Sequence, residues 1–157
     1  MNNQKILEEL FGYKSNQYEL LGIETIEEKK YYVCALKDDK YYSMILIKNL
    51  EERGSDSKLN FVLDYERLND KVMKIADIQV YEKCKGQGSI LMKYAINYLF
   101  TETDIRIATG FLSPVDSDHF DRLEHFYKKF GFEVSFAVDS QGNKISGRIE
   151  KKSNNKN

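Results

Sequence analysis

The hydrophobic pattern changes its period between Val72 and Phe100. Residues 72–80 (VMKIADIQV) have the composition of a β-strand, whereas residues 89–100 (SILMKYAINYLF) repeat apolar side chains at helical spacing. Between them lies YEKCKGQG, in which Gly86 and Gly88 are two residues apart. A strand, a glycine-containing loop and a helix in this order predict a domain of mixed α and β structure.

The glycine segment has two interpretations. The first is a structural turn, because glycine adopts positive φ without steric cost. Alternatively, the free N–H groups and the dipole of the helix N-terminus bind a phosphate, with Lys83 and Lys85 adding positive charge. The nucleotide-binding patterns GxxxxGK[ST] and GxGxxG are both absent from the sequence. On this segment alone, both interpretations remain open.

The first 80 residues predict strands rather than helices, after one short helix over residues 6–11 that ends near Gly12. Three runs rich in aromatic and β-branched residues, separated by charged turns, predict an antiparallel meander. A polar loop follows at residues 49–58. Two further runs predict a second hairpin, with its turn at Asn69 and Asp70. The five runs are 18–26, 31–37, 41–48, 60–68 and 72–80.

The C-terminal half predicts a strand at residues 105–112, a helix after Pro114 and a final hairpin around Gly142. Ser117 or Asp118 is expected to cap the helix, and Gly131 to end it. We therefore expect one domain over residues 1–150 and a disordered tail over residues 151–157. Its fold class is α+β (mixed α/β), with one mostly antiparallel sheet of about seven strands and two main helices in the C-terminal half.

The composition excludes several classes of protein. The chain has 157 residues, a net charge of −1 and no apolar stretch near the ~20 residues that a membrane span needs. Acidic residues are interleaved with basic ones, which disfavours nucleic-acid binding. The polar N-terminus lacks the apolar core of a signal peptide, so we expect a cytoplasmic protein. Two cysteines, Cys34 and Cys84, fit neither a disulfide scaffold nor a metal motif.

Two motifs together resemble the GNAT superfamily of N-acetyltransferases. Its acyl-CoA signature, Q/R-x-x-G-x-G/A between the fourth strand and the next helix, is matched by Lys83, Gly86 and Gly88, with lysine replacing arginine or glutamine. The later family motif F-Y-x-K-x-G-F is matched by FYKKFGF at residues 126–132. The resemblance covers roughly residues 71–150. Phe120 and Asp121 stand where the family commonly has asparagine, and the one or two helices usual between its first two strands are not predicted here.

The resemblance implies a V-shaped opening between the fourth and fifth strands, in which acyl-CoA lies. The backbone of the fourth strand pairs with the pantetheine amides, and N–H groups at the start of the next helix meet the pyrophosphate. Ile78 and Val80 also fit plain core positions, and both roles can hold together. The implied cofactor-binding residues are Ile78, Gln79, Val80, Lys83, Cys84, Lys85, Gly86, Gln87, Gly88 and Ser89.

Two catalytic residues are implied. Tyr127 aligns with the tyrosine that protonates the departing CoA thiolate in many family members, and a phenol with an ordinary pKa of about 10 stays protonated at neutral pH. Its helical spacing with Phe120, Leu123 and Phe130 equally fits a core residue. Asp77, on the strand that precedes the glycine segment, is the carboxylate expected to deprotonate the amine, and Glu82 is a weaker candidate. An exposed strand position is the alternative interpretation of Asp77.

The function implied by the resemblance is transfer of an acetyl group from acetyl-CoA, a co-substrate, directly to a primary amine of a small molecule, peptide or protein. The alternative is a non-catalytic CoA-binding regulatory module with the same fold. The expected partners are acetyl-CoA and an amine acceptor, with neither nucleic acid nor membrane, and a homodimer is compatible with this interpretation. No metal is expected, and His119 and His125 are interpreted as residues of the helix surface.

Overall fold

The structure, a computed structural model, describes residues 2–36, 42–51, 56–64, 66, 71–80 and 86–154. Its elements in chain order are α1 (Asn3–Phe11), η1 (Gly12–Gln17), β1 (Tyr18–Ile26), β2 (Lys29–Leu36), β3 (Tyr42–Lys48), β4 (Ser57–Leu63), β5 (Val72–Gln79), α2 (Gln87–Glu102), β6 (Ile107–Leu112), η3 (Pro114–His119), α3 (Phe120–Lys129), β7 (Glu133–Val138) and β8 (Lys144–Lys152).

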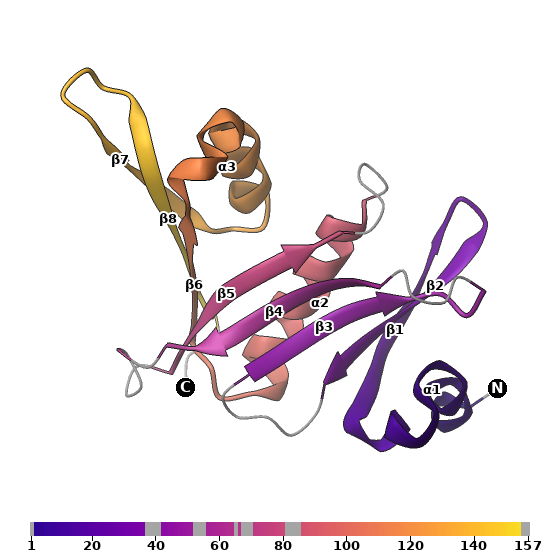
Figure 1. The fold of residues 1–157 in the computed structure, drawn as a ribbon. Helices are drawn as coiled ribbons and strands as arrows, with labels where there is room; N and C mark the ends of the chain where they lie inside the picture. Colours follow the sequence, from indigo (N-terminus) through magenta and orange to yellow (C-terminus); the bar gives the residue numbers. More distant parts are fainter. Residues whose placement is uncertain are drawn as a thin grey trace.

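One eight-stranded sheet in the order β1-β2-β3-β4-β5-β6-β8-β7 forms the centre of the molecule (Figure 1). Neighbouring strands are antiparallel except for β5 and β6, which are parallel and therefore need the crossover through α2. The predicted α+β fold is confirmed, with eight strands instead of about seven. The predicted meander, β1-β2-β3, and the antiparallel pairing of β4 with β5 are also confirmed. β4 ends at Leu63 rather than at residue 68, and the turn predicted at Asn69 and Asp70 lies outside the described residues.

The turn between β1 and β2 has only two residues. Glu27 and Glu28 have φ of 49° and 69° and join Ile26 directly to its partner Lys29. Positive φ at both central residues gives the turn the twist that a tight hairpin needs. The GNAT family's usual helices between the first two strands are thus absent from this fully described part of the chain.

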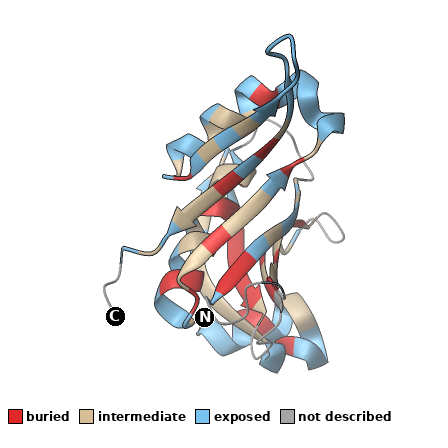
Figure 2. Ribbon diagram, turned by 90° about the vertical axis from the view of Figure 1, so that its left-hand side faces the viewer, coloured by how far each residue is buried: buried red, intermediate tan, exposed pale blue. Residues whose placement is uncertain are grey.

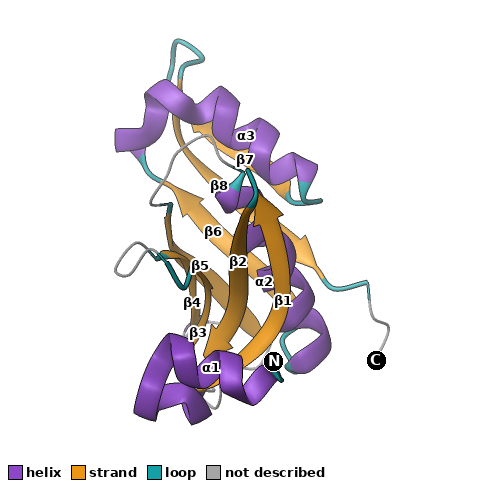
Figure 3. Cartoon of the chain, turned by 90° about the vertical axis from the view of Figure 1, so that its right-hand side faces the viewer, coloured by secondary structure: helices purple, strands orange, loops and turns teal. Residues whose placement is uncertain are grey.

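Alternation along β2 divides the interior into two apolar cores. Tyr31, Val33 and Ala35 belong to the core under α2, whereas Tyr32 and Cys34 belong to the core under α1. The two helices therefore cover opposite faces of the N-terminal strands (Figure 3). Buried residues gather where helices meet the sheet (Figure 2). Those of α2 recur at the predicted helical spacing and are Gln87, Leu91, Met92, Ala95, Leu99 and Phe100.

The second main helix begins later than the sequence predicted. Ser113 accepts a hydrogen bond from the N–H of Val115 and opens the 3₁₀ helix η3, from which α3 continues at Phe120. The prediction that Ser117 or Asp118 caps the helix is therefore wrong, because both lie inside η3. The stop at Gly131 is confirmed, with φ of 84°.

Three element boundaries also differ from expectation. α1 begins at Asn3 rather than at residue 6, because the Asn2 side chain caps it by accepting from the N–H of Lys5. β4 begins at Ser57, inside the predicted loop. β8 continues two residues beyond the expected domain end at residue 150, because Lys151 and Lys152 pair with β6. No helix among the described residues is long and apolar enough to cross a membrane.

Candidate active site

The sheet splits between β5 and β6. The two strands pair only where Val72–Lys74 lies beside Ile107–Thr109. Beyond that point β5 stays with β4, while Gly110–Leu112 pairs with β8, and the two strands diverge in Figure 1. This divergence is the V-shaped opening that the resemblance implied.

An irregularity in β5 shapes the edge of this opening. The register with β4 shifts so that Asn60 pairs with Asp77 and Phe61 with Ile75, which leaves Ala76 as an extra residue. Ile78 and Val80 are half-buried and pack against the core under α2. Side chains of this strand thus contribute to the core, while its backbone borders the opening.

Asp77 and Gln79 are both exposed. The Gln79 amide Nε2 donates to the Asp77 carboxylate at 2.6 Å. Asp77 borders the cavity described below, and its role as the base stays a prediction. Gln79, expected to bind the cofactor, contributes no side chain to the cavity lining described below.

The N-terminus of α2 opens onto the same split. Gly86, its N-cap residue, has φ of 75° and makes no side-chain cap, and an added Cβ there would meet no atom within 4 Å. The helix ladder begins with the Ile90 N–H donating to the Gly86 carbonyl at 3.1 Å. The N–H groups of Gln87, Gly88 and Ser89 therefore have no partner within the helix, which is the arrangement that binds an anion.

A buried polar contact holds this helix end against the sheet. The Ser57 hydroxyl at the start of β4 donates to the side-chain carbonyl of Gln87, and both side chains are buried. Opposite them, the Lys129 ammonium reaches from the end of α3 to the Ser89 hydroxyl at 3.4 Å. The N-terminus of α2, called the helix mouth below, is thus held against β4 and has the Lys129 ammonium beside it. The sequence did not predict the contact between Lys129 and Ser89, because 40 residues separate them.

A cavity of about 690 Å³ lies between this helix mouth, β5, η3 and α3. Of the expected binding residues, six line it: Ile78, Val80, Gly86, Gln87, Gly88 and Ser89. Lys83, Cys84 and Lys85 lie outside the described residues. An ADP-like diphosphate fits the chemistry of this helix end. The helix end offers backbone donors, open space beside Gly86 and the Lys129 ammonium, and the first turn of α2 has no acidic side chain.

Tyr127 forms part of the wall opposite the helix mouth. Its side chain is buried, and its ring makes edge contacts with Phe126 and Phe132 at centroid distances of 5.3 and 5.5 Å. Burial, followed by the negative charge of Asp116, raises the pKa of the Tyr127 phenol to about 12. Tyr127 is therefore a core side chain that also borders the cavity, and its raised pKa keeps the phenol protonated at neutral pH.

Three further polar residues of the cavity lining escaped the sequence reasoning: Asp116 and His119 of η3, and Arg122 of α3. His119 was interpreted as a surface residue; it is exposed and also borders the cavity. No local sequence signal predicts that these three side chains lie near Gly86 and Gly88.

Phe120 and Asp121 do not line the cavity: Phe120 is buried in the core, and Asp121 pairs with Lys144 at 3.6 Å. No group of three potential metal ligands was found among the described residues.

The chain was compared with protein families, with curated proteins and with solved structures. No family model matches the chain. A curated relative, the uncharacterized protein YocC of Bacillus subtilis, is 29% identical over 133 residues, covering 83% of this chain and 77% of YocC.

Several solved acetyltransferases are similar in structure. A chimera of the spermidine N-acetyltransferase SpeG from Vibrio cholerae and hSSAT has a TM-score of 0.55 at 14% identity, covering 73% of this chain and 67% of its own. The N-acetyltransferase PseH of Campylobacter jejuni has a TM-score of 0.51 at 16% identity, covering 73% and 70%. The ribosomal-protein-S18-alanine N-acetyltransferase of Escherichia coli has a TM-score of 0.53 at 10% identity, covering 76% and 74%. The chain has the fold of the GNAT N-acetyltransferases.

Proposed function

We propose that this protein is an N-acetyltransferase that transfers the acetyl group of acetyl-CoA directly to a primary amine. The observation that carries the proposal is the open N-terminus of α2, facing a cavity at the split between β5 and β6, with Tyr127 in the opposite wall. The structural neighbours carry out N-acetylation of amines according to their names.

The N–H groups of Gln87, Gly88 and Ser89 would hold the pyrophosphate of CoA. Lys129 would add a positive charge beside Ser89. Lys83 and Lys85, which lie outside the described residues, precede this helix end in the sequence. The free backbone edge of β5 at Ile78 and Val80 would pair with the pantetheine amides, because β6 has moved away from it. The thioester then lies toward the narrow end of the split.

In the proposed reaction the amine nitrogen bonds to the acetyl carbon, the carbon–sulfur bond breaks, and sulfur receives a proton. Tyr127 supplies that proton as general acid, since its raised pKa keeps the phenol protonated. The same apolar surroundings disfavour a thiolate, so they also raise the proton affinity of the leaving sulfur. Asp77 takes the proton that the amine loses, through its exposed carboxylate at the rim.

One observation favours the alternative, a CoA-binding module without catalysis. Neither Phe120 nor Asp121, which occupy the neighbourhood of the family's asparagine, reaches the cavity. In that case the helix mouth would bind CoA as before, while no amine would be acetylated.

Calorimetric titration with acetyl-CoA, combined with a thiol-release assay over a panel of amines, separates the two functions. The proposed function requires saturable binding and acceptor-dependent release of CoA, with an acetylated amine detected by mass spectrometry. Binding without release under any acceptor would establish the CoA-binding module. No binding of acetyl-CoA would refute both.

A further inference from the structure

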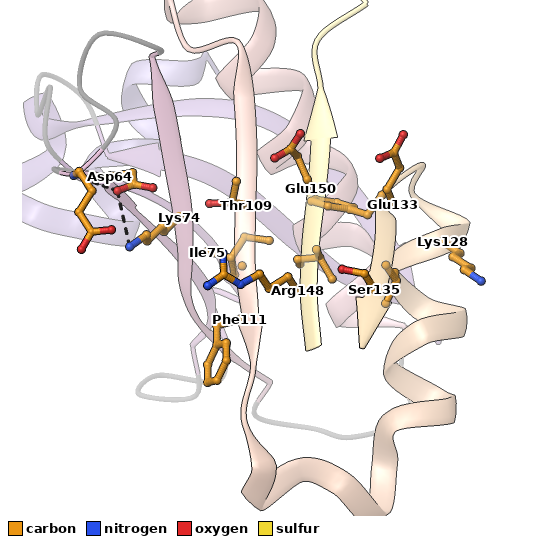
Figure 4. Close-up of a pocket in the computed structure, with 15 residues that line it drawn as sticks. Asp64, Lys74, Ile75, Thr109, Phe111, Lys128, Glu133, Ser135, Arg148 and Glu150 are labelled. Atoms are coloured by element: carbon orange, nitrogen blue, oxygen red, sulfur yellow. Dashed lines mark hydrogen bonds and ion pairs between the residues drawn. The ribbon is translucent and has the colours of Figure 1, made fainter. Parts of the chain in front are cut away.

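The extra residue in β5 decides which side chains of this strand face α2. Before it, Ile75 packs against the core under α2. Lys74 points to the other face, where it lines a second cavity of about 970 Å³ and pairs with the Asp64 carboxylate at 3.6 Å (Figure 4). Because Ala76 is inserted, the next core position is Ile78, three residues after Ile75 instead of the two of a regular strand.

The inserted residue brings two polar side chains together on the face away from α2. Asp77 takes the position two after Ile75, which would face the core in a regular strand, and Gln79 follows on the same face. On the neighbouring strand, Asn60 lies opposite Asp77 and Lys58 opposite Gln79. Residues two apart on one face have Cα atoms about 7 Å apart, a distance that a glutamine side chain can span.

Only one member of this pair belongs to the cavity that would hold acetyl-CoA. Asp77 lines that cavity, whereas Gln79 does not. The Gln79 side chain is directed at Asp77 instead, and its Nε2 donates to the carboxylate Oδ2 at 2.6 Å. Hydrogen bonds to a charged acceptor are among the strong ones. The Gln79 side chain can therefore influence a reaction in the cavity through Asp77.

We propose that Gln79 is a positioning residue, which holds the Asp77 carboxylate in the orientation that accepts the proton of the acceptor amine. The inference rests on the proposed function, in which Asp77 is the base. The N–H bond of the acceptor ammonium breaks, and its electron pair forms the new bond to the acetyl carbon. The proton binds to Oδ1 of Asp77, because Oδ2 is engaged by Gln79. Water at the exposed rim then takes the proton from Asp77.

The hydrogen bond restricts the rotamers of an exposed side chain. Without it, Asp77 would sample several staggered rotamers, of which only some aim the carboxylate at the amine. Catalysis depends steeply on such geometry, and a misplacement of about 1 Å can lower a rate by about a hundredfold. Thermal motion would still bring Asp77 into position part of the time. We therefore expect Gln79 to contribute about tenfold to kcat, less than the ~10²–10⁴-fold of a base itself.

The variant Gln79→Met removes the hydrogen-bond donor and keeps the length of the side chain. The acceptor is the fastest of butylamine, 1,4-diaminobutane and a peptide with a free N-terminus, measured by acetyl-CoA-dependent thiol release. We expect kcat to fall about tenfold, while KM for the amine and the Kd of acetyl-CoA change less than about twofold. Gln79→Glu keeps the shape but places a second carboxylate beside Asp77, so kcat should fall at least as far.

Gln4→Met is the matched control. It removes an equivalent exposed hydrogen bond, from Gln4 Nε2 to Glu8 Oε1 at 3.0 Å in α1, and should keep the wild-type kcat. Both Asp77 and Gln79 are exposed, so all variants should fold like the wild type, as checked by circular dichroism.

A double-mutant cycle with Asp77→Asn shows whether Gln79 acts through Asp77. Asp77→Asn alone should lower kcat by about a hundredfold or more, and adding Gln79→Met should lower it by less than about twofold further. An unchanged kcat for Gln79→Met or for Asp77→Asn, a loss confined to KM, or losses that multiply in the double variant would overturn the inference and leave N-acetylation standing. Binding of acetyl-CoA with acetylation of none of the three acceptors overturns both the inference and the proposed function.

Discussion

Replacing Gly86 by glutamate is the substitution expected to weaken CoA binding most. The new carboxylate would stand at the N-cap of α2, where none of the described residues comes within 4 Å of an added Cβ, so the side chain meets no clash with them. It would, however, occupy the space into which the backbone donors point. We expect Gly86→Glu to abolish CoA binding while the protein stays folded.

Two free energies decide the outcome: the backbone strain, which lowers the stability of the fold, and the charge repulsion, which weakens CoA binding. Holding a non-glycine residue at the observed φ of 75° costs about 1–2 kcal/mol, well below the typical total stability of about 5–15 kcal/mol. Two like charges about 5 Å apart, at an effective dielectric constant of about 20, repel by about 3 kcal/mol. That repulsion weakens binding by about two orders of magnitude for a single phosphate charge.

Gly86→Gln is the matched control, because it has the same backbone strain and nearly the same shape without the charge. Calorimetry should give a Kd for CoA that is at least about a hundredfold weaker for the glutamate variant than for the glutamine variant. Circular dichroism spectra should be the same for the two variants, and the melting temperature of the glutamate variant should be no lower than that of the glutamine variant, because a carboxylate is favourable at a helix N-terminus. If the folded glutamate and glutamine variants bind CoA within threefold of each other, the diphosphate does not lie at this helix end.

Three further outcomes are expected. Tyr127→Phe keeps the ring contacts and should lower kcat by about a hundredfold, the lower range for a general acid, with little change in the Kd of acetyl-CoA; an unchanged kcat on a true acceptor would leave Tyr127 a packing residue. Gly88→Ala should raise the melting temperature, because its Cβ meets Val80 at an ordinary 3.6 Å and alanine favours a helix by about 1 kcal/mol; a lower melting temperature would show that the helix start needs glycine. Burial raises the pKa of the Cys34 thiol from 9.0 to about 12, so above pH 9 the unfolded chain loses a proton that the native protein keeps. The free energy of unfolding measured in urea should therefore fall between pH 9 and 12, more steeply in the wild type than in Cys34→Ala by about 1.4 kcal/mol per pH unit; equal slopes would contradict the assigned shift.

The sequence was most informative where a single local rule decides the structure. The helical period of residues 89–100 predicted α2, and the position of Gly131 after a helical pattern predicted its left-handed backbone, because glycine adopts that conformation without cost. The runs of aromatic and β-branched residues predicted the strands, although they did not assign their faces. Which side of β2 meets α1 and which meets α2 depends on packing across the whole sheet.

The parts that the sequence did not predict arise from long-range geometry. The extra residue Ala76 and the divergence of β5 from β6 leave no local signature, because each depends on the register of a neighbouring strand. Lys129 reaches Ser89 across 40 residues.

The central claim is that the first backbone amides of α2 bind the diphosphate of CoA. Titration of ¹⁵N-labelled protein with CoA, followed by amide NMR, tests it directly. The largest chemical-shift changes should fall on Gln87, Gly88 and Ser89 and should saturate with the calorimetric Kd. Saturable binding that leaves these three amides unmoved would contradict the claim.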